Sequence, residues 1–331
     1  MFAAILLLAS SCAFAQSTHF ETSVVPLPNE DIAAVCHYTL TIPSPEHPIR
    51  AVWVIFDRGR DVHDLYSDPA VMLLARRFHL AILLHGHCPG KAPEDHRDMN
   101  MHPVEGLGRA LFTALDQFAQ MSGHREVSTA KLIFLGFSGA GPLSARFVGL
   151  VPDRVIAVIL SAPGHYEPNG INTVHLSARS MGVPEMVIAG GADDISGTAR
   201  PYEYFKKYRE QGAPWLFVLQ NKSPHCCTAN VRDLILLWLK AVLKERCVSS
   251  CETLAAMNQH RGWLAYIKTR ETNIKDSFGF QTFDATDAKI QKSKRGVPRE
   301  WSTAGWLPNY TIAKEWLSFV EQPRHPILPL R

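Results

Sequence analysis

The sequence predicts an α/β fold: a mostly parallel central sheet with helices on both faces, followed by a C-terminal extension. Short apolar runs alternate with longer segments of helical spacing, and this order repeats across residues 51–246. Such alternation is typical of parallel strands joined by right-handed crossover helices. A chain of 331 residues is long enough to bury one large core of this kind.

Six apolar runs predict the core strands. They are rich in Val, Ile, Leu and Phe and contain few charged residues, as expected for strands that are buried on both faces. The runs are residues 51–56, 80–84, 131–135, 154–160, 185–189 and 215–219. We expect additional antiparallel strands before residue 51, for example over residues 34–42.

Amphipathic segments between these runs predict the helices. Apolar residues recur at helical spacing over residues 71–78, 107–118 and 231–242. Residues 252–331 lack the strand–helix rhythm, although three tryptophans are grouped there. We therefore divide the chain into a leader over residues 1–15, a main α/β domain over residues 16–246, and an extension over residues 247–331 packed on that domain.

A small-residue turn follows the strand at residues 131–135. Its sequence is Gly136-Phe137-Ser138-Gly139-Ala140, and a helix is predicted to begin directly after it. Reactive side chains of parallel sheets lie at the carboxyl ends of strands, and a serine on so sharp a turn needs small neighbours. Ser138 is therefore the candidate nucleophile, although Ala140 stands where the usual motif has glycine. The alternative is a glycine-rich turn with an uninvolved serine.

With this turn and this strand order, residues 34–246 resemble the α/β-hydrolase superfamily. The similarity is greatest to exported serine esterases such as feruloyl esterases and polyhydroxyalkanoate depolymerases. The resemblance implies an α/β-hydrolase fold and a catalytic triad whose members follow in the chain order Ser, Asp or Glu, His. It also implies a small-molecule or polymeric ester as substrate, with no metal and no organic cofactor.

The acid and the base of such a triad have candidates at the same end of the sheet. The strand at residues 185–189 runs into a turn containing Asp193 and Asp194, and both fit a G-x-x-D spacing. We prefer Asp193 because Ile195 then stands two residues later, where related turns carry an apolar residue; Asp194 is the alternative. His225 follows the last core strand and is the predicted base, which a carboxylate would orient.

An oxyanion hole needs two backbone N–H donors that are fixed in advance. Gly139, directly after the candidate nucleophile, is expected to supply one of them. We assign the other to Arg58, in the loop after the strand at residues 51–56. His85-Gly86 resembles the family's usual His-Gly loop, but only one strand then remains before the turn, whereas the family has two.

The N-terminus has the composition of a secretory signal. Residues 1–8 are almost wholly apolar, and Ala13-Phe14-Ala15 precedes Gln16, although no Lys or Arg comes before the apolar stretch. We expect a secreted or periplasmic protein. The apolar stretch is too short to span a bilayer and no later segment is long enough, so stable membrane insertion is not expected.

Cysteine usage agrees with export. After the leader the chain contains Cys36, Cys88, Cys226, Cys227, Cys247 and Cys251, which predicts disulfides. Cys247 and Cys251 form the most local pair; the connectivity is otherwise open, and buried free thiols are the alternative. His85, His87 and Cys88 are close in sequence, but no second cluster has zinc-ligand spacing, so no metal site is predicted.

Charge and loop length narrow the function further. The net charge of +3 and the absence of a basic stripe argue against nucleic acid as a partner. Residues 161–183 are too few for a cap domain, which favours an open site. We predict a secreted serine hydrolase that cleaves carboxylic esters through an acyl-enzyme. A serine peptidase on the same fold and a non-catalytic binding protein are the alternatives.

Overall fold

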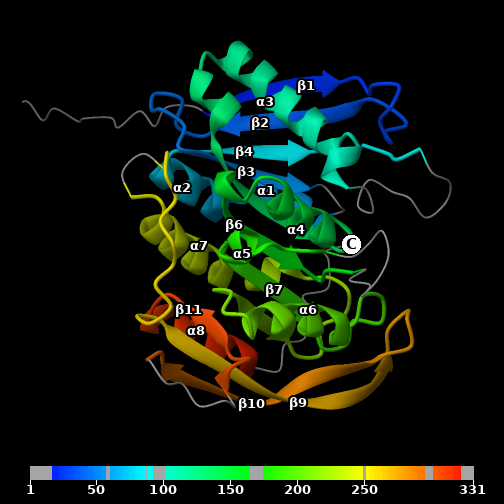
Figure 1. The fold of residues 1–331 in the computed structure, drawn as a ribbon, viewed down its shortest axis with the longest axis vertical. Coiled ribbons are helices and arrows are strands. Elements are labelled where there is room, and N and C mark those ends of the chain that lie inside the picture. The colour runs from blue at the N-terminus through cyan, green and yellow to red at the C-terminus, as the bar shows by residue number, and fades with distance from the viewer. Residues whose placement is uncertain are drawn as a thin grey trace, which may run out of the picture.

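The computed structural model describes residues 17–56, 60–86, 88–91, 102–164, 174–248, 251–294 and 301–321. Within them, an eight-stranded sheet has the order β1-β2-β4-β3-β5-β6-β7-β8 (Figure 1). β1 and β2 are antiparallel additions, and the pairs from β4 to β8 are parallel. The predicted α/β-hydrolase type of fold is therefore confirmed. The strands are β1 (Thr18–Val24), β2 (Cys36–Ile42), β3 (Ala51–Phe56), β4 (Leu80–His85), β5 (Lys131–Phe137), β6 (Val155–Ser161), β7 (Glu185–Gly190) and β8 (Leu216–Gln220).

All six predicted core strands form, and the antiparallel strand expected over residues 34–42 is β2. β1 is a second antiparallel strand before residue 51, and no residue range was predicted for it. Its side chains alternate between half-buried and exposed positions, because β1 is an edge strand with one face to solvent. It therefore lacks the continuous apolar run by which the buried strands were recognised.

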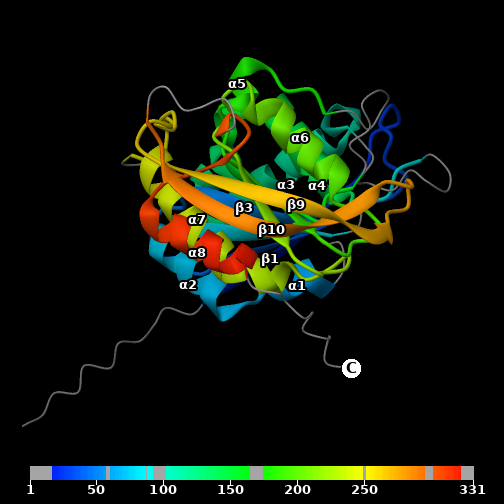
Figure 2. The same cartoon turned by 90° about the horizontal axis from the view of Figure 1, so that it is seen from below.

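Helices cover both faces of the sheet (Figure 2). α3, α4, α5 and α6 lie on one side, and α1, α2 and α7 lie on the other. The helices are α1 (Arg60–Tyr66), α2 (Pro69–Phe78), α3 (Leu107–Ser122), α4 (Ala140–Leu150), α5 (Ala178–Met181), α6 (Ala199–Arg209) and α7 (Arg232–Arg246). Short 3-10 turns are η2 (Pro103–Glu105), η3 (Arg125–Thr129), η4 (Pro152–Arg154) and η5 (Thr228–Val231).

The C-terminal extension has regular structure that the sequence did not predict. β9 (Trp263–Lys275), β10 (Gln281–Lys292) and β11 (Gly305–Leu307) form an antiparallel sheet of order β10-β9-β11, and α8 (Tyr310–Glu321) follows. This second sheet lies beyond β8, at the end of the molecule opposite β1 (Figure 1). β9 begins with a short apolar run at residues 263–267, but the rest of the strand is mostly polar and half-buried or exposed, unlike the buried core strands.

The extension covers the β8 edge of the main sheet. The Trp306 backbone N–H donates to the Trp215 carbonyl at 2.7 Å, and the Trp316 indole N–H donates to the Phe217 carbonyl at 2.8 Å. Both indoles are buried. An uncovered edge strand presents unpaired backbone groups that invite aggregation. These tryptophans therefore close the sheet, and we assign them a structural role.

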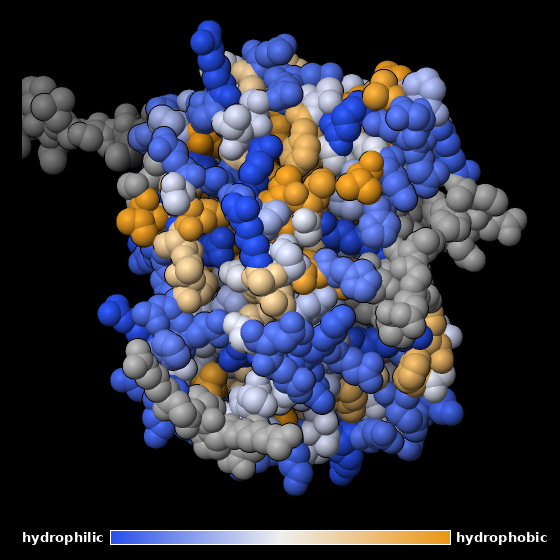
Figure 3. Space-filling view, viewed as in Figure 1, coloured by the Kyte–Doolittle hydropathy of each residue, from blue (hydrophilic) through white to orange (hydrophobic). Residues whose placement is uncertain are grey.

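The surface is mixed in polarity. In the space-filling view, hydrophilic residues predominate around α6, and hydrophobic residues occur in small scattered groups (Figure 3). Groups of this kind are normal on a folded domain. Among the described residues, no helix has both the length and the hydrophobicity that crossing a membrane requires.

One carboxyl group lies wholly inside the core. Glu185, the first residue of β7, has no exposed surface, and the Tyr204 hydroxyl donates to its Oε2 at 3.2 Å. Burial raises the pKa of the Glu185 carboxyl to about 8. The carboxyl is therefore mainly protonated at neutral pH in the folded protein, whereas it ionises in the unfolded chain.

We predict that Glu185 makes the folded state less stable as the pH rises. Between its ordinary pKa and about 8, the folded state holds a proton that the unfolded state has lost, so the free energy of unfolding falls with pH. Between pH 5.5 and pH 7.5, the free energy of unfolding measured by urea titration should fall by about 2 kcal/mol more for the wild type than for Glu185→Gln. The exposed Glu203→Gln is the control and should keep the wild-type pH dependence. Equal pH dependence in Glu185→Gln and the wild type would contradict the prediction.

Candidate active site

Ser138 occupies a strained turn between β5 and α4. Its φ is +54°, in the left-handed region that few non-glycine residues adopt. The surrounding backbone holds it there: the Ser138 N–H donates to the Ser161 carbonyl at 2.9 Å, and its carbonyl accepts from Gly141 at 2.9 Å and Gly164 at 3.2 Å. Strain of this kind persists only where neighbouring contacts enforce it.

The small residues beside Ser138 are required by close packing. A Cβ atom built on Gly136 would overlap the Ala140 carbonyl, and one built on Gly141 would lie 2.5 Å from the Pro163 Cβ. Ala140 stands where the usual motif has glycine, and it is only 1% exposed. Its methyl group fits within the core, so the departure from the motif leaves the turn intact.

His225 connects Ser138 to Asp193. The His225 Nε2 lies 3.0 Å from the Ser138 Oγ, and its Nδ1 lies 2.9 Å from the Asp193 Oδ2. With the Nδ1 proton donated to the carboxylate, Nε2 is free to accept the serine proton. Asp193 is completely buried, whereas the His225 side chain keeps 11% of its surface exposed. The three side chains form one hydrogen-bonded chain from the core to the surface.

The turn at residues 190–194, called the acid turn below, carries two adjacent carboxylates that have different surroundings. The Asp193 Oδ1 accepts the Ile195 N–H at 2.9 Å and the Ser196 N–H at 2.8 Å, which leaves Oδ2 for His225. Asp194 is exposed. The structure thus brings Asp193 to the histidine and does not bring Asp194.

The loop at residues 221–225, called the base loop below, carries His225. The acid turn and the base loop are in direct backbone contact because β7 and β8 are parallel neighbours. The Gly191 N–H donates to the Gln220 carbonyl and the Ala192 N–H to the Ser223 carbonyl, both at 2.8 Å. A Cβ on Gly190 would lie 2.5 Å from the Ser223 carbonyl oxygen, so only glycine permits this approach. These contacts set the spacing between Asp193 and His225.

Gly139 is well placed to stabilise negative charge near Ser138. It is the N-cap of α4, where backbone N–H groups have no acceptor within the helix and the helix dipole is positive. The other predicted donor, Arg58, lies outside the described residues. Its loop follows β3, which pairs directly with β5. β3 separates β4 from β5, and the His85 ring is buried beside Tyr38 and Phe56.

The cysteines form three pairs within disulfide-bonding distance. The Cα–Cα separations are 4.5, 3.7 and 4.3 Å for Cys36–Cys88, Cys226–Cys227 and Cys247–Cys251. Cys247–Cys251 is the pair that the sequence offered as the most local option, and the other two pairings could not be predicted from it. Among the described residues, no group of three His, Cys, Asp or Glu side chains is arranged to hold a metal ion.

A separate cavity of about 600 Å³ lies at the amino-terminal ends of the parallel strands. Arg50, His79 and Lys131 line it, and they immediately precede or begin β3, β4 and β5. Ser138 and His225 lie at the carboxyl ends of the strands instead. The cavity is therefore distinct from the hydrogen-bonded triad, and we place the candidate site at the triad.

Comparison with known proteins finds matches among solved structures. No protein-family model matches the sequence, and no curated protein matches it. Solved structures do. The chain is structurally similar to α/β serine hydrolases and esterases.

Three of these solved structures illustrate the likeness. An α/β serine hydrolase without a lid from Xanthomonas campestris has 15% identity and a TM-score of 0.44, with 70% of this chain and 94% of that chain covered. An S-formylglutathione hydrolase from Staphylococcus aureus has 12% identity and a TM-score of 0.47, with 69% and 100% covered. A ferulic acid esterase has 13% identity and a TM-score of 0.47, with 67% and 97% covered. The likeness concerns the fold alone.

We predict that Gly136→Ala destabilises the protein by about 2 kcal/mol or more, because the added methyl group meets the Ala140 backbone. Gly149→Ala is the control. Gly149 is an exposed residue of α4 with room for a methyl group, so alanine should raise the free energy of unfolding by about 0.5 kcal/mol. Urea unfolding of both variants tests the pair, and a Gly136→Ala protein of wild-type stability would refute the packing argument.

Proposed function

We propose that the protein is a serine hydrolase that cleaves carboxylic esters. The observation that carries this proposal is the continuous hydrogen-bond chain from Ser138 through His225 to the buried Asp193. A serine hydroxyl is a weak nucleophile, and it becomes effective when a base accepts its proton and a carboxylate orients that base. The strained Ser138 backbone supports the same role.

In the proposed acylation step, the Ser138 Oγ attacks the ester carbonyl carbon while its proton moves to the His225 Nε2. Asp193 stabilises the imidazolium that forms, because its Oδ2 already accepts the Nδ1 proton. The carbonyl oxygen gains negative charge and accepts the Gly139 N–H; we propose that the Arg58 N–H is the second donor. Collapse of the intermediate breaks the ester C–O bond, and His225 protonates the departing alcohol.

Deacylation uses the same groups in reverse. A water molecule takes the place of the alcohol and gives a proton to the His225 Nε2 as its oxygen attacks the acyl carbon. The bond to the Ser138 Oγ then breaks, the serine recovers its proton from His225, and the carboxylic acid leaves. The described residues between β6 and β7 contain only the short helix α5. This supports an open site and an ester of varied size, including a polymeric one.

We further propose that the protein is exported and contains disulfides. The composition of residues 1–15 and the three close cysteine pairs support both statements.

We predict that a fluorophosphonate probe labels the wild-type protein and that Ser138→Ala abolishes both labelling and ester hydrolysis. The reason is that Ser138 supplies the attacking oxygen. Ser144→Ala, which alters a buried serine on the adjacent helix, is the control and should keep labelling. A Ser138→Ala protein that still reacts would overturn the nucleophile assignment. Nitrophenyl esters of graded acyl length, run beside peptide substrates, separate an esterase from a peptidase.

The acid assignment has its own test. Asp193→Asn removes the carboxylate that orients His225, and kcat should fall by about 10³- to 10⁴-fold. Asp194→Asn changes an exposed side chain of the same turn and should leave kcat within about twofold of the wild type. A larger loss in Asp194→Asn than in Asp193→Asn would reverse the assignment.

A further inference from the structure

The C-terminal extension contacts both loops that carry the proposed base and acid. On β10, the Asp284 Oδ1 accepts the Lys222 N–H at 2.8 Å. The same oxygen occupies the space that a Cβ atom on Gly191 would need. Lys222 belongs to the loop that ends at His225, and Gly191 belongs to the turn that ends at Asp193. A single carboxylate therefore lies against both segments.

Asp284 contacts the base loop at Lys222, where the backbone is strained. Lys222 has a φ of +58°, which is unfavourable for a residue with a Cβ atom. The adjacent Asn221 binds the extension through both ends of its amide. Its Oδ1 accepts the Ala285 N–H at 2.8 Å, and its Nδ2 donates to the carbonyls of Ala285 at 3.2 Å and Val320 at 3.1 Å. Asn221 and Lys222 thus tie the base loop to β10 and α8.

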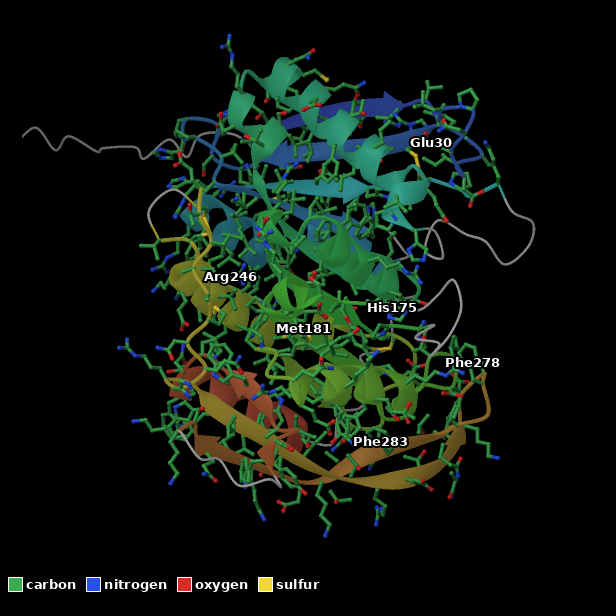
Figure 4. The ribbon with its side chains drawn as sticks, in the orientation of Figure 1. Glu30, His175, Met181, Arg246, Phe278 and Phe283 are labelled. Atoms are coloured by element: carbon green, nitrogen blue, oxygen red, sulfur yellow. A yellow bond between two sulfur atoms is a disulfide. The ribbon has the colours of Figure 1, made fainter. Side chains whose placement is uncertain are left out.

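The other side of the acid turn is also held by the β9–β10 hairpin. The Ser277 Oγ donates to the Asp194 carbonyl at 3.3 Å, and the Phe283 N–H donates to the Thr198 Oγ1 at 2.8 Å. Figure 4 shows Phe283 on β10 beside α6 and Phe278 at the turn of the hairpin. The Phe283 ring centroid lies 5.4 Å from that of Tyr202 on α6. The turn carrying Asp193 therefore lies between β7 and the extension.

We propose that Asp284 is a positioning residue for the triad. It holds the base loop and the acid turn at a fixed separation, so that His225 and Asp193 keep their hydrogen bond. This inference rests on the proposed function, because it concerns the rate of the same reaction. Asp284 contacts neither Ser138 nor His225 and acts through the backbone of residues 191 and 222. A misplacement of about 1 Å at a triad can cost about 100-fold in rate.

The test compares three variants of the full chain in nitrophenyl acetate hydrolysis and in the rate of fluorophosphonate labelling. Asp284→Ala removes the acceptor, and we expect kcat and the labelling rate to fall at least about tenfold with KM within about twofold. Asp284→Asn retains an Oδ1 acceptor of the same shape and should restore kcat to within about threefold of the wild type. Asp287→Ala is the matched control, because Asp287 lies on the same strand and pairs with Lys289 at 3.0 Å. It should behave as the wild type.

Circular dichroism at the assay temperature ensures that folded proteins are compared. A folded Asp284→Ala with wild-type kcat, even with a lower Tm, would show a structural role only and overturn the proposal. Failure of Asp284→Asn to recover kcat would also overturn it. If the wild type reacts with the probe and hydrolyses the ester, and Asp284→Ala has the same kcat, the positioning role is refuted and the proposed function is retained. A wild type that neither labels nor hydrolyses esters refutes the proposed function, and the positioning role with it.

Discussion

The hydrogen bond between the His225 Nδ1 and the Asp193 Oδ2 is the interaction on which the site depends. It joins two loops that leave neighbouring parallel strands, and it directs the other imidazole nitrogen toward Ser138. The bond requires a buried carboxylate that already accepts hydrogen bonds from the protein. The N–H groups of Ile195 and Ser196 meet this need, since burying a carboxylate without partners would be costly.

The loops themselves are held together by backbone contact. Glycine at residues 190 and 191 allows the acid turn to approach the base loop, and the N–H groups of Gly191 and Ala192 donate to the carbonyls of Gln220 and Ser223. β10 then supports this pair from outside through Asn221 and Asp284. The extension that closes the β8 edge thus also lies against the loops at the end of β7 and β8. Sheet closure and site geometry share one structural element.

The sequence was sufficient for the parallel core and for the places of Ser138 and His225. Apolar runs determine which segments are buried, and loops at the carboxyl ends of parallel strands must lie at one edge. The sequence was insufficient to predict the strands β1, β9 and β10, because their exposed faces carry polar side chains. The pairing of Cys36 with Cys88 was equally beyond reach, because it joins segments that are 52 residues apart. The role of Arg58 stays a prediction.

Local sequence by itself determined the fold class and the turn at Ser138, because strand burial and steric limits at glycine act within a few residues. The sequence favoured Asp193 over Asp194 through Ile195, but only the tertiary structure shows which of the two carboxylates reaches His225. Both satisfy the same spacing, and the difference lies in which side chain points inward. The inward side chain of Asp193 reaches His225, which lies 32 residues further along the chain and beyond β8, and no local pattern encodes a contact over that distance.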